Sequence, residues 1–259
     1  MMNPPPDDRP AAGTPAATRR RSLLGLAAAG AAGVLLAPGI QLIEIARAAT
    51  PGKTGANPAV RWGMLIDTTK CDSGCTDCVT ACNVENGLDP QPTPTSAQWI
   101  RKVEIKPVGK IGRAASLPVM CQHCAEPPCV DVCPTGASFK RADGIVLVDR
   151  HTCIGCRYCM MACPYKARSF VHEPLTDQKP DVPRGKGCVE SCTLCVQRID
   201  RGETTTACAE ACTKAGHGAI VFGNLNDPES EISRRLREIS SRALRADLAL
   251  DPGVRYHGI

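Results

Sequence analysis

Residues 153–164 read CIGCRYCMMACP, and they place cysteines at positions 153, 156, 159 and 163 with a proline directly after the last. Cysteines this close together cannot easily bridge one another as disulfides, but their thiolates can converge on a metal. The composition agrees with such a role, because the chain of 259 residues has 17 cysteines and only 8 aromatic residues. A protein with so few aromatic side chains needs something besides ordinary apolar packing to hold it together.

The spacing C-x2-C-x2-C-x3-C-P resembles the run by which bacterial ferredoxins bind [4Fe–4S] clusters. In that run three thiolates hold one cluster and the fourth ligates the other cluster of a pair. The first three cysteines are expected on a loop that wraps one cluster. We expect Cys163 to start the next helix and turn towards a second cluster, with Pro164 in the first helical turn, where its missing N–H does no harm.

Further cysteines form three more groups of four on either side of this run. They are Cys71-x3-Cys75-x2-Cys78-x3-Cys82, Cys121-x2-Cys124-x4-Cys129-x3-Cys133-Pro134 and Cys192-x2-Cys195-x12-Cys208-x3-Cys212. Structural zinc binds through short knuckles separated by a dozen or more residues, which these dense runs exceed. The sequence therefore favours iron–sulfur clusters over zinc.

If the groups exchange their fourth cysteines as ferredoxins do, four ligand sets result. They are Cys121, Cys124, Cys129 and Cys163; Cys153, Cys156, Cys159 and Cys133; Cys71, Cys75, Cys78 and Cys212; and Cys192, Cys195, Cys208 and Cys82. We expect four [4Fe–4S] clusters, or three if one site is empty, because the first and fourth groups depart from the plain spacing.

Cys188 is left over from these sets. The spacing Cys188-x3-Cys192-x2-Cys195 copies the start of the first group, so Cys188 is either a substitute ligand for Cys192 or a bystander thiol. We favour the bystander.

Other features of the composition argue against an enzyme and against a nucleic-acid partner. The formal net charge is +5, without a long basic run. The sequence lacks a glycine-rich dinucleotide fingerprint and a flavin motif, and its histidines show no catalytic spacing. His123 is expected to face solvent, with donation to a cluster sulfur as the alternative. Arg157 and Lys166 are expected to be solvated surface charges, with a rise in the local reduction potential as the alternative. An electron carrier without a catalytic residue is the expected function.

The N-terminus resembles a twin-arginine export signal. Arg20-Arg21-Ser22-Leu23-Leu24 precedes a weakly apolar stretch, and Ala46-Arg47-Ala48 supplies small residues for cleavage after Ala48. Residues 1–48 are therefore expected to direct the folded protein to the periplasm. The chain lacks a run of 18 apolar residues, so membrane association is expected through partners only.

The remaining chain predicts an α+β fold of tandem bacterial-ferredoxin-like 4Fe–4S modules with loop insertions and a C-terminal helix. The expected domain covers 49–226, with one module formed by 71–82 with 188–212 and the other by 121–163. Strands are expected at 60–67, 98–106, 144–149 and 219–222. Residues 227–259 are expected to form a C-terminal helix and tail, with the helix at 229–247.

Several phrases resemble those of the four-cluster electron-transfer subunits of membrane-bound bacterial oxidoreductases, the DmsB, PsrB, HybA and NrfC-like family. They are CQHCAEPPC at 121–129, CTLC at 192–195, RIDRG at 198–202, GNLNDP at 223–228 and GVRY at 253–256. Within this family the chain is most similar to the DsrO type, the periplasmic iron–sulfur subunit of the Dsr complex of dissimilatory sulfur metabolism.

The resemblance implies two partners, an integral NrfD-type quinone-interacting subunit and a multihaem cytochrome c. The alternative within the same class is the electron-transfer subunit of a periplasmic molybdopterin oxidoreductase of the polysulfide or tetrathionate reductase type.

Overall fold

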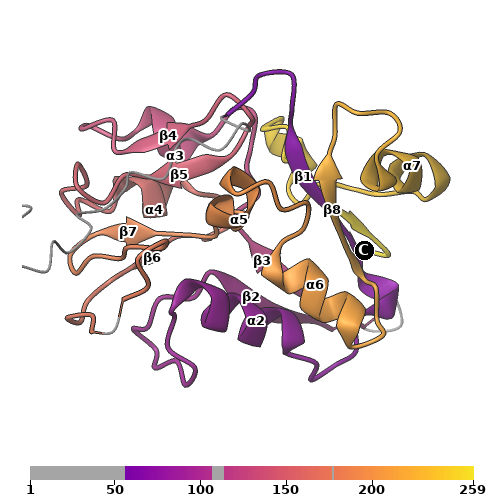
Figure 1. The fold of residues 1–259 in the computed structure, drawn as a ribbon, viewed down its shortest axis with the longest axis horizontal. Coiled ribbons are helices and arrows are strands. Elements are labelled where there is room, and N and C mark those ends of the chain that lie inside the picture. Colours follow the sequence, from indigo (N-terminus) through magenta and orange to yellow (C-terminus); the bar gives the residue numbers. More distant parts are fainter. Residues whose placement is uncertain (1–55, 107–113, 177) are drawn as a thin grey trace, which may run out of the picture. The chain divides into compact units, whose positions relative to one another are not determined.

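The computed structural model describes residues 56–106, 114–176 and 178–259 (Figure 1). The expected export segment 1–48 lies outside the described residues. The strands are β1 (Trp62–Asp67), β2 (Ile100–Ile105), β3 (Ala115–Met120), β4 (Ser138–Lys140), β5 (Val146–Val148), β6 (Ser169–Phe170), β7 (Val189–Glu190), β8 (Ile220–Asn224) and β9 (Val254–His257). The helices are η1 (Thr68–Lys70), α2 (Asp77–Asn86), α3 (Pro128–Asp131), α4 (Tyr158–Ala162), α5 (Val196–Asp200), α6 (Ala207–Lys214), α7 (Glu231–Glu238) and η2 (Ala246–Leu248).

A three-stranded sheet with the order β8-β1-β9 joins the two ends of the described chain. β1 pairs antiparallel with β8 and parallel with β9, so Met64 lies between Phe222 and Val254. The consecutive residues Met64, Leu65 and Ile66 are all buried because this strand is central and covered on both faces. The strands expected at 60–67 and 219–222 are confirmed, whereas β9 was not expected.

Three antiparallel two-stranded pairs, β2–β3, β4–β5 and β6–β7, make up the other sheets. The strands expected at 98–106 and 144–149 are confirmed as β2 and β5. An isolated two-stranded pair is at best marginally stable in water, so these pairs depend on what packs between them. The loops that carry the cysteines run between these pairs and the helices.

The C-terminal helix is shorter than expected. The side chain of Ser230 caps α7 by accepting a hydrogen bond from the backbone N–H of Ser233, and the helix ends at Glu238 rather than at 247. The chain turns away because Arg242 exchanges two backbone hydrogen bonds with Tyr256 of β9, 2.7 and 2.8 Å long. This pairing over a long sequence distance overrides the helical spacing of residues 239–247.

The core contains apolar side chains together with most of the cysteines. Trp99 and Tyr256 are the largest of the fully buried side chains. The Tyr256 hydroxyl donates to the carbonyl of Pro118 at 3.1 Å and accepts from the side-chain amide of Gln122 at 3.2 Å. It therefore ties β9 to β3 and to the loop of the second cysteine group. Helices and small sheets mix as the α+β class predicts.

Candidate metal centres

The four cysteine groups share a left-handed residue directly before their second cysteine. The φ angles are 83° at Gly74, 44° at His123, 70° at Gly155 and 53° at Leu194. This conformation costs a non-glycine residue about 1–2 kcal/mol, so the surrounding structure must hold His123 and Leu194 in it. All four loops therefore turn in the same way, including those of the first and fourth groups, whose spacing departs from the plain run.

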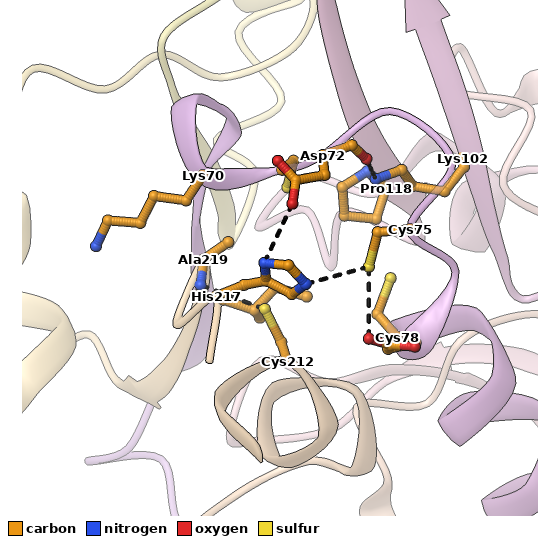
Figure 2. Close-up of a pocket in the computed structure, with 12 residues that line it drawn as sticks. Lys70, Asp72, Cys75, Cys78, Lys102, Pro118, Cys212, His217 and Ala219 are labelled. Carbon is orange, nitrogen blue, oxygen red and sulfur yellow. Dashed lines mark hydrogen bonds and ion pairs between the residues drawn. The ribbon is translucent and has the colours of Figure 1, made fainter. Parts of the chain in front are cut away.

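One small cavity is lined by the loop of the first group, α2 and the end of α6 (Figure 2). The cysteines in its lining are Cys71, Cys75, Cys78 and Cys212. Figure 2 shows the sulfur atoms of Cys75, Cys78 and Cys212 facing the same space. The structure thus brings together one whole predicted set, including the fourth cysteine from the distant group.

Two other small cavities hold two more of the predicted sets. One is lined by Cys121, Cys124, Cys129 and Cys163, and the other is lined by Cys133, Cys153, Cys156 and Cys159. In both, the fourth cysteine comes from the neighbouring group. The structure therefore gathers each of these sets around one space.

The position of Cys163 relative to the helix differs from the prediction. α4 ends at Ala162, and Cys163 follows it in an extended conformation rather than starting a helix. Cys133 likewise follows α3. The two helices are only four and five residues long, so the last cysteine of each group follows directly after a short helix and lies in the cavity of the other group.

The fourth set, Cys82, Cys192, Cys195 and Cys208, is buried between α2, α5 and α6. Burial raises the pKa of Cys82 well above its ordinary value, and the adjacent sulfurs of Cys208 and Cys195 raise it further. Burial and the sulfur of Cys82 do the same to the pKa of Cys192. These four thiols therefore lie close enough to disfavour one another's charge.

The donor chemistry of these sites fits iron–sulfur clusters. All 17 cysteines lie among the described residues, and each is a free thiol. Burial raises the pKa of Cys78 and of Cys129 to about 11 and that of Cys124 and of Cys208 to about 12. Without a metal such thiols stay neutral, whereas a bound cation turns each into a thiolate ligand. Sets of four soft sulfur donors select iron–sulfur clusters or zinc.

The four sets adjoin one another in a row. Cys159 belongs to the set 133/153/156/159. Burial raises its pKa, and the Cys129 sulfur of the set 121/124/129/163 raises it further, whereas Arg168 lowers it. Cys121 interacts with the side chain of Ser191, the neighbour of Cys192 in the chain. Cys78 in turn acts on the pKa values of Cys82 and Cys208.

Cys188 does not lie where its spacing suggested. Its pKa is raised by burial and by the neighbouring Cys153, and its Sγ lies 3.2 Å from the carbonyl oxygen of Arg150. A Cβ at Gly155 would lie only 2.2 Å from the carbonyl of Gly187, which shows how closely the two segments pack. Cys188 therefore adjoins the set that contains Cys153 rather than the set of Cys192.

Replacing Cys188 with alanine is expected to leave the iron content unchanged at about 16 atoms per chain, because four other thiols surround that cavity. Iron and acid-labile sulfide analysis of the variant checks this. Loss of about four iron atoms would show instead that Cys188 is a ligand.

Three residues near the cysteines were missed or misjudged in the sequence. His123 is buried rather than solvent-facing, and its Nδ1 accepts a hydrogen bond from the backbone N–H of Val146 at 3.0 Å. Burial, with the charge of Arg168, lowers the pKa of His123 to about 3. Arg168 itself is buried against Cys129. Short-range spacing carries no signal for any of these contacts.

His217 is the third such residue, at the mouth of the first cavity (Figure 2). Its Nε2 lies 3.7 Å from Cys75 Sγ, and its Nδ1 lies 3.6 Å from a carboxylate oxygen of Asp72. Cys75, Asp77 and His217 together offer sulfur, oxygen and nitrogen donors within 4.8 Å of one another. Zinc accepts all three donor types, so zinc must be measured beside iron.

Arg157 and Lys166 are exposed, as expected. The Arg157 guanidinium lies 4.5 Å from the centre of the Phe170 ring. Among the residues that the structure describes, no helix is long and apolar enough to cross a membrane.

Comparison with known proteins bears on what these sites hold. Two family patterns, each described as a 4Fe-4S dicluster domain, match residues 65–137 and 113–224. The Hdr-like menaquinol oxidoreductase iron-sulfur subunit 1 of Archaeoglobus fulgidus is 42% identical in an alignment of 272 positions, which covers 92% of this chain and 97% of that protein.

Two further relatives belong to different complexes. One subunit of the tetrathionate reductase of Salmonella typhimurium is 36% identical and covers 88% of this chain and 85% of its own length. The menaquinone reductase iron-sulfur cluster-binding subunit of Nitratidesulfovibrio vulgaris is 36% identical and covers 76% of this chain and 88% of its own length.

Proposed function

The chain belongs to the family of iron–sulfur electron-transfer subunits of oxidoreductase complexes, and we propose that it passes single electrons between a membrane quinone-interacting subunit of the NrfD type and a multihaem cytochrome c or another redox subunit. Like its relatives, it is not a catalytic subunit. Its two dicluster domains bind several [4Fe–4S] clusters.

The observation that carries the proposal is the row of four thiol sets. When bound, a [4Fe–4S] cluster supplies a site that takes up and releases one electron. The chain itself sets the order of the sites: 133/153/156/159, then 121/124/129/163, then 82/192/195/208, then 71/75/78/212. The first and last sets of this row include partly or fully exposed cysteines, and the two inner sets are buried.

We also propose that the subunit is of the DsrO type, periplasmic, exported folded by the twin-arginine route and engaged in dissimilatory sulfur metabolism. The arginine pair Arg20-Arg21 supports export, and the similarity to an Hdr-like menaquinol oxidoreductase subunit over nearly the whole chain supports a quinone-linked complex. The similarity to the tetrathionate reductase subunit supports the second candidate, a subunit of a periplasmic molybdopterin reductase.

One experiment separates these candidates. The tagged protein is purified without oxygen from the periplasmic side of native membranes, and the subunits that accompany it are identified. An NrfD-type subunit with a multihaem cytochrome c supports the first proposal. A molybdopterin subunit supports the second, and recovery from the cytoplasm contradicts both.

The contact with the membrane subunit is proposed at the set that contains Cys156, the exposed cysteine of the row. Ile154, Tyr158 and Met161 are 68%, 59% and 74% exposed around it. Exposed apolar side chains of this size commonly mark interaction sites. The flanking cations Arg157 and Lys166 suit acidic residues at the rim of an apolar surface on that subunit.

Replacing Met161 with glutamate is expected to weaken the association with the membrane subunit about tenfold or more, because it places a charge in the centre of the contact. Quantitative co-purification measures the effect, with the iron content as a check on folding. Val84→Glu is the matched control, since Val84 is 65% exposed on α2, away from Cys156. Equal losses from both variants would contradict the proposed contact.

A further inference from the structure

Arg168 is a buried cation that touches a predicted cluster ligand. Its side chain lies in the core, where the residue is only 5% exposed. Its Nη2 donates to the Sγ of Cys129 at 3.1 Å and to the hydroxyl of Ser138 at 2.8 Å. A guanidinium is charged at every physiological pH, so this position holds a permanent positive charge inside the protein.

The described residues do not provide an anion for this charge. Its Nε and Nη1 atoms are buried without a hydrogen-bond partner, and none of the ion pairs found among the described residues involves it. Two partly buried arginines do have carboxylates: Arg184 binds Glu190 at 2.5 Å, and Arg141 binds Asp143 at 2.9 Å. Because an unpaired buried charge is strongly destabilising, the missing anion must be something the protein binds.

The position of Arg168 shows which anions these are. Arg168 lines the cavity of Cys121, Cys124, Cys129 and Cys163 and contacts the Cys129 sulfur. Ser138, which accepts its other hydrogen bond, lines the cavity of Cys133, Cys153, Cys156 and Cys159. A [4Fe–4S] cluster with four thiolates carries a net charge of about −2 in its oxidised form, so both sites become anionic when loaded.

We propose that Arg168 is the residue that positions and tunes two adjacent clusters, those of 121/124/129/163 and 133/153/156/159, by offsetting part of their negative charge and raising their reduction potentials. This inference rests on the proposed electron-transfer function. An electron that arrives at either site comes from the neighbouring site or partner, which loses it. The added electron places one more negative charge beside the guanidinium, and the guanidinium stabilises this reduced form. No bond breaks and no proton leaves Arg168.

The test is a redox titration followed by EPR on the anaerobically purified full-length holoprotein and its variants. Arg168→Gln keeps a hydrogen-bond donor and removes the charge. Two of the four midpoint potentials are expected to fall, with the ratio of reduced to oxidised cluster at the wild-type midpoint decreasing about tenfold, or about 59 mV for one electron. The other two potentials are expected to stay.

Arg101→Gln is the matched control. The Arg101 guanidinium binds the carbonyls of Tyr165 and Lys166 in the same segment as Arg168, and within the described part of the chain it makes no hydrogen bond to sulfur. Its removal is expected to leave all four potentials unchanged. Arg168→Lys keeps the charge, so it is expected to keep all clusters and to shift the two potentials less than Arg168→Gln does.

Unchanged potentials in Arg168→Gln, or equal shifts of all four, would overturn the proposal. If Arg168→Gln loses iron, Arg168→Lys decides. Iron loss from that variant, or an equal shift of all four of its midpoint potentials, would exclude a role of the charge. A wild-type protein without reversible clusters would contradict the proposed function instead, so the two failures are distinguishable.

Discussion

Replacing Cys163 with alanine is expected to remove the cluster of the set Cys121, Cys124 and Cys129, and to leave that of Cys153, Cys156 and Cys159 in place. The reason is the crossed arrangement, in which Cys163 leaves α4 and enters the cavity of the preceding group. Iron is expected to fall from about 16 to about 12 atoms per chain, with loss of one EPR signal on reduction. A [3Fe–4S] signal in place of the lost one would also report damage at that site.

Cys159→Ala is the matched control for this variant, since Cys159 stands four residues earlier in the same run but lines the other cavity. The two variants are expected to lose different EPR signals. Loss of the same signal from both would contradict the crossed assignment, because it would place Cys163 and Cys159 on one cluster.

Removing residues 252–259 is expected to abolish soluble, cluster-loaded protein. β9 pairs with β1 at the centre of the sheet, and Val254 and Tyr256 are fully buried. Deleting a buried aromatic side chain alone costs about 3–5 kcal/mol, and the truncation also exposes one edge of β1. That loss approaches the whole stability of a domain, about 5–15 kcal/mol.

Yield of soluble protein and iron per chain measure the effect of the truncation. Deleting only Ile259 is the control, because this residue is 38% exposed and lies beyond β9. A truncated protein that still binds about 16 iron atoms would show that the tail is dispensable for the cluster sites.

The spacing of the cysteines predicted the most local part of the sites. Ligands two to four residues apart are set by one loop, so the membership of each group could be read directly. The exchange of Cys133 with Cys163, and of Cys82 with Cys212, was predictable only through the ferredoxin resemblance. The structure gathers each of these sets, and ligation itself stays a prediction.

Contacts between residues far apart in the chain could not be predicted. Arg168 differs from a surface arginine only in what packs around it, and His217 contacts Cys75 although the two residues lie 142 positions apart in the sequence. The spacing of Cys188 suggests a ligand that could replace Cys192. Because Gly155 and Gly187 pack closely, however, Cys188 lies beside Cys153. Spacing along the chain says nothing about such approaches.

The end of the chain shows the same limit in its secondary structure. Residues 239–247 have helical spacing, but Arg242 pairs with Tyr256 and the helix stops at Glu238. The strand Val254–His257 is short, and its parallel partner lies at the other end of the described chain. A pattern within a window of residues cannot reveal a partner of that kind.

We expect this chain to hold four [4Fe–4S] clusters in a row. Purification of the protein without oxygen, followed by measurement of iron, acid-labile sulfide and zinc and by EPR spectra on reduction, tests this. About 16 iron and 16 sulfide per chain, with magnetically coupled spectra, is the expected result. About 12 of each would leave one site empty, and zinc without sulfide would contradict the electron-transfer account.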